Sequence, residues 1–254
     1  MQKIAVMSGK GGVGKSFVSA GLATALQRCG VKVGVLDADV IGASIPRMYG
    51  LDARLHVNDK QKIIPAETKS GVKVISISLA LPSDDKAVIW RGPMISNAIS
   101  QFYDDADWSD VDVLVIDLPP GTSDAALTVL QSIKPEGIVV VATPQDLVRT
   151  IARKSVDMAM HIGARVVGAV ENMTYVSCPH CGEQVDLFGA SDAEKGFRDV
   201  GIDLLASLPL LPDASMLADE GRIEDLDPEL LSGVADAVVS FLETAPEPEP
   251  SARD

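Results

Sequence analysis

The sequence is poor in aromatic, cysteine and basic residues, and it has no long apolar run. Of 254 residues, 4% are aromatic and three are cysteine, and 22 Lys and Arg stand against 36 Asp and Glu, for a formal net charge of −14. Such a charge repels phosphate backbones and anionic lipid, so we expect neither nucleic acid nor membrane as a partner. Three cysteines exclude a disulfide scaffold and predict a reducing compartment. No apolar stretch approaches the roughly 18 residues of a membrane span and no signal core opens the chain, which predicts a cytoplasmic protein.

Apolar residues make up 46% of the chain and gather in short runs rich in Val and Ile. The runs are apolar on consecutive residues rather than on alternate ones, which predicts strands covered on both faces, as in a parallel sheet. Stretches with apolar residues at helical spacing lie between them. The predicted strands are residues 3–7, 32–36, 72–79, 111–116, 137–142, 166–170 and 204–208, and the predicted helices are residues 15–28, 93–103, 124–132, 147–161 and 229–243.

This alternation predicts a single α/β domain over residues 1–243. Right-handed crossovers between parallel strands would place helices on both faces of the sheet and give a three-layer α/β/α sandwich with a mostly parallel central sheet. The last residues, 244–254, are rich in Pro and Glu and cannot bury apolar area, so we expect a disordered acidic tail.

A glycine-rich segment between the first strand and the first helix fits the pattern G-x-x-x-x-G-K-[ST]. Its glycines let backbone N–H groups converge on the β- and γ-phosphates of a nucleotide, and the helix N-terminus adds partial positive charge. Lys15 would neutralise phosphate charge and Ser16 would bind Mg²⁺. A turn that only packs helix on strand is the alternative, but the full motif favours a P-loop NTPase. The predicted contacts are Gly9, Lys10, Gly11, Gly12, Val13, Gly14, Lys15, Ser16 and Phe17.

Three aspartates follow predicted strands, where ligands gather in open α/β sheets. Asp117 comes after four apolar residues and is the predicted Walker B carboxylate that holds Mg²⁺. Asp37 is expected near the metal, and Asp39 is expected to position or activate the attacking water. The carboxylates could instead cap helices or close turns. Because the carboxylates make the site strongly anionic when no metal is bound, the sequence also predicts that the site depends strictly on Mg²⁺.

Cys178 and Cys181 form a C-x-x-C pair after the sixth predicted strand. The third cysteine, Cys29, ends the first helix and is expected to be a small buried apolar residue. One pair supplies two of the four ligands of a zinc or iron–sulfur site, and a C2 dimer would supply the other two. A redox-active pair and a purely structural pair are the alternatives.

Taken together, the motifs resemble the Mrp/ApbC-type iron–sulfur cluster carriers, which are P-loop ATPases of the MinD, ParA and nitrogenase iron-protein class. Lys10 gives the loop the deviant form of that class, although a solvated loop lysine would be a simpler reading. Further motifs of the resemblance are Leu36-Asp37-Ala38-Asp39, Trp90-Arg91-Gly92-Pro93-Met94, Gln101-Phe102, Asp117-Leu118-Pro119-Pro120-Gly121-Thr122, Glu171-Asn172-Met173 and Cys178-Pro179-His180-Cys181-Gly182.

The resemblance implies a homodimer that sandwiches two ATP molecules, with Lys10 reaching the nucleotide of the opposite subunit. It implies slow ATP hydrolysis and a labile 4Fe-4S cluster held across the interface by Cys178 and Cys181, with cluster scaffold proteins and apo iron–sulfur proteins as partners. By the same resemblance Asn172 would read the adenine amino group and Pro209 would border the base. Without the resemblance, Asn172 could simply satisfy a strand end.

Two other functions compete with the carrier. A positioning or partition ATPase would use the same nucleotide switch on membrane or DNA, but the chain has neither a basic amphipathic end nor a basic cluster. A zinc-stapled regulatory protein would need only zinc at the cysteine pair. The sequence also departs from the carrier pattern at Ala43, where proline is usual, and at Ser123, where glycine is usual; both lie in loops expected to move, and Ser123 would remove backbone freedom there.

Overall fold

The computed structural model describes residues 1–40, 42–80, 92–121, 124–144, 148–189 and 193–244. The predicted tail beyond Thr244 and the motif residues Trp90, Arg91, Thr122 and Ser123 lie outside these ranges. The strands are β1 (Gln2–Ser8), β2 (Val33–Asp37), β3 (His56–Val57), β4 (Ile63–Ile64), β5 (Ala66–Glu67), β6 (Lys73–Ser76), β7 (Val113–Asp117), β8 (Gly137–Ala142), β9 (Arg165–Glu171), β10 (Val176–Ser177), β11 (Gln184–Val185) and β12 (Leu204–Ser207). The α-helices are α1 (Lys15–Arg28), α2 (Ile45–Met48), α3 (Gly92–Asp105), α4 (Asp124–Ile133), α5 (Val148–Ile162), α6 (Ala193–Arg198), α7 (Pro212–Asp219) and α8 (Ser232–Thr244), and the 3-10 helices are η1 (Ile77–Leu79), η2 (Ile223–Asp225) and η3 (Pro228–Leu230).

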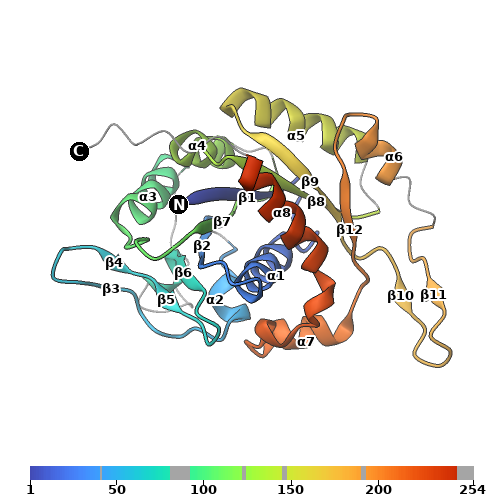
Figure 1. The fold of residues 1–254 in the computed structure, drawn as a ribbon, viewed down its shortest axis with the longest axis horizontal. Helices are drawn as coiled ribbons and strands as arrows, with labels where there is room; N and C mark the ends of the chain where they lie inside the picture. The colour runs from blue at the N-terminus through green and yellow to red at the C-terminus, as the bar shows by residue number, and fades with distance from the viewer. Residues whose placement is uncertain (41, 81–91, 122–123, 145–147, 190–192, 245–254) are drawn as a thin grey trace.

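One eight-stranded sheet forms the centre of the protein (Figure 1), in the order β12-β9-β8-β1-β7-β2-β6-β5. Every neighbouring pair is parallel except β5 and β6 at one edge. All seven predicted strands belong to this sheet, and the predicted mostly parallel α/β/α fold is confirmed.

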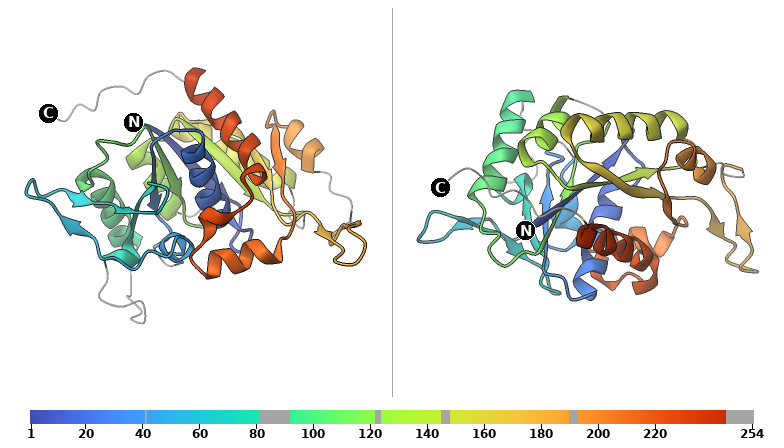
Figure 2. Two further views of the ribbon diagram at one scale, coloured as in Figure 1. Left: turned by 60° about the horizontal axis from the view of Figure 1, so that its bottom comes forward. Right: turned by 45° about the horizontal axis from the view of Figure 1, so that its top comes forward.

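Helices cover both faces of the sheet, as the two turned views in Figure 2 show. Alternate residues of β1 belong to different cores: Ile4 and Val6 pack with residues of α1 and α8, whereas Ala5 and Met7 pack with residues of α3, α4 and α5. Both sets are almost fully buried. The consecutive apolar runs of the sequence therefore follow from a sheet that has no solvent-facing side at its centre.

Two predicted elements have different limits in the structure. The strand expected over residues 72–79 ends at Ser76, because the Ser76 hydroxyl accepts the N–H of Ser78 and starts η1. The helix expected from residue 229 begins at Ser232, because Asp227 caps the short helix η3 through the N–H of Glu229.

Several short elements carry too weak a pattern to be predicted. They are the helices α2, α6 and α7 and the hairpins β3–β4 and β10–β11, whose strands have two residues each. Figure 1 shows the two hairpins projecting from opposite ends of the protein. A strand of two residues has no readable periodicity, so only the turn residues around it could have indicated it.

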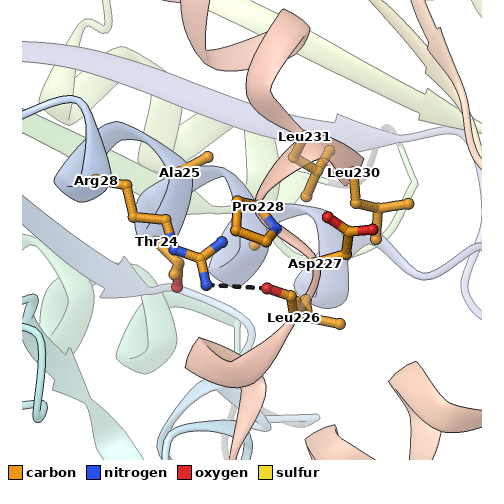
Figure 3. Close-up of a pocket in the computed structure, with 9 residues that line it drawn as sticks. Thr24, Ala25, Arg28, Leu226, Asp227, Pro228, Leu230 and Leu231 are labelled. Atoms are coloured by element: carbon orange, nitrogen blue, oxygen red, sulfur yellow. Dashed lines mark hydrogen bonds between the residues drawn. The ribbon is translucent and has the colours of Figure 1, made fainter.

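Helix α1 is tied at its C-terminal end to η2 and to Leu226, the residue that follows η2 (Figure 3). The Arg28 guanidinium donates to the carbonyl oxygens of Glu224, at 2.7 Å, and Leu226, at 2.9 Å. The cavity beside these two hydrogen bonds has a volume of about 10 Å³, which is room for a single water. This joint therefore holds α1 in place and is too small for a ligand.

Candidate nucleotide and metal site

Strand register brings the two central carboxylates together. Asp117 is the register partner of Val6 on one side and of Asp37 on the other, and Asp37 in turn pairs with Ser76. These four residues form one row across β1, β7, β2 and β6 at the carboxyl ends of the strands. Parallel strands place such ends at one edge of the sheet, next to the loop that leaves β1.

The glycine loop from Gly9 to Ser16 turns directly into α1. Gly14 lies at the helix N-cap with a left-handed backbone, φ 81°. A Cβ at Gly14 would come within 2.2 Å of Nδ2 of Asn172, so no other residue fits there. Asn172 is buried, and its Nδ2 donates to the carbonyl oxygen of Val13 at 3.0 Å. Its side chain therefore fixes the phosphate loop rather than a strand end.

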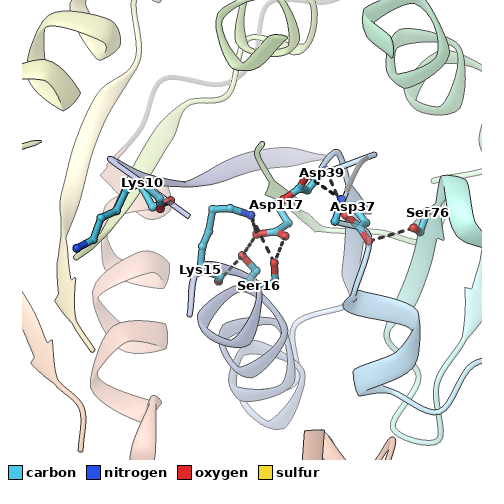
Figure 4. Close-up of polar contacts among 10 residues, drawn as sticks. Lys10, Lys15, Ser16, Asp37, Asp39, Ser76 and Asp117 are labelled. Carbon is cyan, nitrogen blue, oxygen red and sulfur yellow. Dashed lines mark hydrogen bonds and ion pairs between the residues drawn. The ribbon is translucent and has the colours of Figure 1, made fainter. Parts of the chain in front are cut away.

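Three side chains of α1 surround the Asp117 carboxylate. The Lys15 ammonium lies 2.7 Å from Oδ1, the Ser16 hydroxyl donates to Oδ2 at 2.6 Å, and the Ser19 hydroxyl donates to Oδ1 at 2.6 Å. Figure 4 shows Lys15 and Ser16 converging on Asp117. Lys15 is 6% exposed and Asp117 is fully buried, so this is a desolvated ion pair with charge-assisted hydrogen bonds.

Besides Ser76, which contacts Asp37, Ser19 is a residue of this site that sequence reasoning missed. It lies three residues after Ser16, so it shares a face of α1 with Ser16 and with the metal site. That spacing is the available signal, but the surrounding apolar residues make position 19 look like an ordinary core position.

Asp37 is buried beside Asp117 and is held by two donors. The Ser76 hydroxyl donates to its Oδ2 at 3.0 Å, and the backbone N–H of Asp39 donates to its Oδ1 at 3.2 Å. Burial, followed by the charge of Asp117, raises the pKa of Asp37 from 3.8 to about 7, although the Ser76 hydrogen bond and the Lys15 charge act in the opposite direction. A cation at this place would remove the unfavourable proximity of the two carboxylates.

Asp39 is half-buried and closes a turn, because its carboxylate accepts the N–H of Gly42 at 3.2 Å. This is the turn role that the sequence left open for this aspartate. Together, the hydroxyl of Ser16 and the carboxylates of Asp37 and Asp117 form a set of hard oxygen ligands, which is the chemistry that Mg²⁺ prefers. The residues present thus fit a magnesium ion.

Lys10 lies on the opposite side of the loop from Lys15. Its backbone carbonyl accepts the Ser8 hydroxyl at 2.9 Å, while its exposed side chain extends away from Lys15 and the carboxylates (Figure 4). The two lysines of the loop therefore point in different directions, Lys15 toward the carboxylates and Lys10 away from them.

The cysteine pair lies at the tip of the β10–β11 hairpin. Cys178 is half-buried and Cys181 is exposed. The backbone N–H of Cys178 bonds to the carbonyl of Glu183 and that of Gly182 bonds to the carbonyl of Cys178, both at 2.8 Å. Donation to the Cys178 sulfur by the N–H of His180, then by the N–H and thiol of Cys181, lowers the pKa of the Cys178 thiol. A turn that favours thiolate in this way suits a soft metal centre.

The described part of the chain offers this pair no further ligands. Among the described residues, no group of three or more His, Cys, Asp or Glu side chains gathers where it could hold a metal. The expectation that Cys29 is buried is wrong: α1 ends at Arg28 and the chain turns at Gly30, so Cys29 is left exposed at the helix C-cap.

A short segment connects the nucleotide loop to the cysteine hairpin. It runs from Asn172 to Cys178 and is hydrogen-bonded to the start of the β12–α7 connection, where the N–H of Thr174 bonds to the carbonyl of Leu208 and the N–H of Leu210 to that of Tyr175. Pro209 stands between those two bonds. Asn172, Pro209 and the hairpin thus belong to one bonded unit.

A glycine loop at a helix N-terminus, a buried lysine and two registered carboxylates at parallel strand ends define a P-loop NTPase. A model of the family ParA, described as NUBPL iron-transfer P-loop NTPase, matches residues 1–240, and the chain belongs to that family. None of the described helices has the length and apolar character needed to cross a membrane.

Named relatives agree with this family. The chain is 43% identical over 229 residues to an iron-sulfur cluster carrier protein of Clostridium perfringens, which covers 87% of this chain and 80% of the relative. It is 44% identical over 220 residues to an iron-sulfur cluster carrier protein of Methanocaldococcus jannaschii, and the match covers 86% of this chain and 76% of the relative. A nucleotide-binding protein from Archaeoglobus fulgidus, solved in complex with ADP, superposes with a TM-score of 0.81 at 40% identity over 98% of this chain and 93% of that one. The resemblance stated from the motifs is confirmed.

Proposed function

We propose that this protein is a slow, Mg²⁺-dependent ATPase that carries a 4Fe-4S cluster across a homodimer and transfers it to apo-proteins. The observation that carries the proposal is a pair of thiols, in a turn that favours thiolate, one short segment away from the phosphate loop. Membership of an iron-transfer family and relatives named as cluster carriers support the same function.

In the proposed nucleotide site, the residues of the glycine loop and the three aspartates bind phosphate, Mg²⁺ or the attacking water. The loop from Gly9 to Phe17 cradles the phosphates with its backbone N–H groups, and Lys15 exchanges Asp117 for phosphate oxygens. Ser16, Asp37 and Asp117 hold Mg²⁺, which neutralises phosphate charge when bound. Asp39 positions the attacking water.

Two further residues orient the base, and one acts between subunits. Asn172 and Pro209 border the adenine from one bonded unit. Lys10, directed away from its own carboxylates, stabilises the phosphates of the opposite subunit, as an arginine finger does.

At the cargo end, Cys178 and Cys181 supply half of a four-thiolate site. A homodimer with two-fold symmetry brings the second pair to the same place. The cluster is cargo rather than a resident cofactor, because an exposed hairpin holds it and both partner classes, scaffold proteins and apo-proteins, must reach it. Zinc at the same four sulfurs is the alternative occupant.

The test is anaerobic reconstitution with iron and sulfide, followed by absorption spectroscopy and analysis of iron and acid-labile sulfide. We expect a brown protein with one cluster per two chains, and loss of the cluster in Cys178→Ala and in Cys181→Ala. Cys29→Ala is the matched control, because Cys29 is an exposed thiol on another element, and this variant should load as wild type does.

Stoichiometric zinc with no uptake of a cluster would reject the carrier and favour a zinc-stapled regulatory protein. Equal cluster loading in all three variants would show that Cys178 and Cys181 do not bind the cluster.

A further inference from the structure

Ser19 makes a contact that neither phosphate binding nor metal ligation explains. Its side chain is fully buried in α1, and its hydroxyl lies 2.6 Å from Oδ1 of Asp117 and 3.1 Å from the carbonyl oxygen of Lys15. A hydroxyl has a single proton to donate. The shorter contact to the charged oxygen takes that proton, because a carboxylate is the stronger acceptor.

The other two donors to Asp117 have second tasks in the proposed function. Lys15 is drawn toward phosphate and Ser16 toward Mg²⁺, and both movements remove a partner from Asp117. Ser19 faces the carboxylate from one turn further along α1 and has no such task. Asp117 is buried, and a buried carboxylate without a fixed donor can turn away from the metal.

We propose that Ser19 is a positioning residue for the Walker B carboxylate: its hydroxyl holds Oδ1 of Asp117 so that the carboxylate stays aimed at the metal when Lys15 and Ser16 leave it. This inference rests on the proposed Mg²⁺–ATP site. It adds to that site a residue that touches neither the nucleotide nor the ion.

Ser155 offers a matched control in the same fold. It too is a buried serine inside a helix, and its hydroxyl donates to the carbonyl of Ile151, four residues before it, at 2.9 Å. Ser155→Ala therefore removes a buried helical hydroxyl and its local hydrogen bond without touching a carboxylate.

The experiment titrates Mg²⁺ into the protein with a non-hydrolysable ATP analogue and follows the thermal unfolding midpoint, so that no turnover is needed. In Ser19→Ala we expect the half-saturating Mg²⁺ concentration to rise about 10-fold, the usual effect of losing a hydrogen bond behind a metal ligand. Any response to the analogue in EDTA should be the same as in wild type, because the Ser19 hydroxyl contacts Asp117 and the Lys15 carbonyl rather than the glycine loop. Ser155→Ala should leave the Mg²⁺ midpoint at its wild-type value.

Ser19→Thr keeps the hydroxyl and should restore the Mg²⁺ midpoint to within about 2-fold of wild type, even if its extra methyl group lowers the unfolding temperature. Equal Mg²⁺ midpoints in Ser19→Ala and Ser155→Ala would overturn the role of Ser19 alone. A wild-type protein that does not respond to the analogue at any Mg²⁺ concentration would instead reject the proposed nucleotide site.

Discussion

At the residue scale, Asp37 is a buried carboxylate whose pKa depends strongly on its surroundings. It is buried next to the negative charge of Asp117, and its pKa of about 7 means that the folded protein keeps a proton that the unfolded chain loses near pH 4. The contribution of Asp37 to stability is therefore at its most favourable below about pH 4. This contribution decreases as the pH rises from about 4 to about 7, where Asp37 becomes charged in the folded state as well.

We predict that the metal-free protein loses stability between pH 5 and pH 8, and that Asp37→Asn removes most of this loss. A pKa difference of this size corresponds to a free energy on the order of 4 kcal/mol. Of this total, roughly 1.5 kcal/mol is already lost at pH 5 and roughly 3 kcal/mol more is lost by pH 8, so the advantage of the variant should be small at pH 5 and large at pH 8. Urea unfolding in EDTA at both pH values measures this. A wild-type stability that rises from pH 5 to pH 8 would contradict the prediction.

At the scale of elements, the sequence predicted what local patterns encode. The seven strands were evident from consecutive apolar residues, and α1 from a glycine loop followed by helical spacing. Strand order was not evident, because β7 lies between β1 and β2 although it is far from both along the chain. The contacts of Ser76 with Asp37 and of Ser19 with Asp117 depend on that order, so the sequence could not pair these residues, although the spacing of Ser19 from Ser16 places both serines on one face of α1.

Two glycines join α2 to the end of α7. A Cβ on Gly221 would lie 2.5 Å from Cα of Gly50, and one on Gly50 would lie 2.9 Å from the carbonyl oxygen of Gly221. Arg47 and Asp219 add an exposed ion pair to the same joint. Because α2 directly follows the Asp39 turn, this joint holds the far end of that loop.

We predict that Gly221→Ala is strongly destabilising, since both its backbone and its surroundings reject a side chain. The matched control is Gly201→Ala: Gly201 has a similar positive φ of 78°, but open space where the Cβ would stand. The control should lose about 1 kcal/mol for the left-handed backbone, and Gly221→Ala about 2 kcal/mol more for the clash. Chemical denaturation of both variants measures the difference, and equal losses would mean that the joint can open without cost.

At the scale of the whole molecule, the proposed dimer accounts for a metal site that one chain leaves incomplete. One chain supplies two thiols for a four-thiolate site, and a second copy would supply the other two. A net charge of −14 opposes close association of two copies, so the proposed interface would need local compensation, to which Mg²⁺ and Lys10 would contribute.

Subunit complementation tests this arrangement. Lys10→Ala and Asp39→Ala should each bind ATP and hydrolyse it poorly, because each lacks one half of the machinery. In a mixed dimer, the site of the Lys10→Ala subunit has its own Asp39 and the partner's intact lysine, so random mixing should restore about a quarter of the wild-type rate. Equal mixtures are assayed for phosphate release against each variant alone. A mixture no faster than its components would place Lys10 at the nucleotide of its own subunit.

The β10–β11 hairpin contributes no side chain to either core of the protein. Alkylation of Cys178 and Cys181, a change in their spacing or their replacement should therefore change the free energy of unfolding of the protein only slightly. In the proposed carrier, substitutions in this hairpin could change which metal centre is held without altering the nucleotide site. An engineer could graft a different metal-binding turn onto the same two short strands.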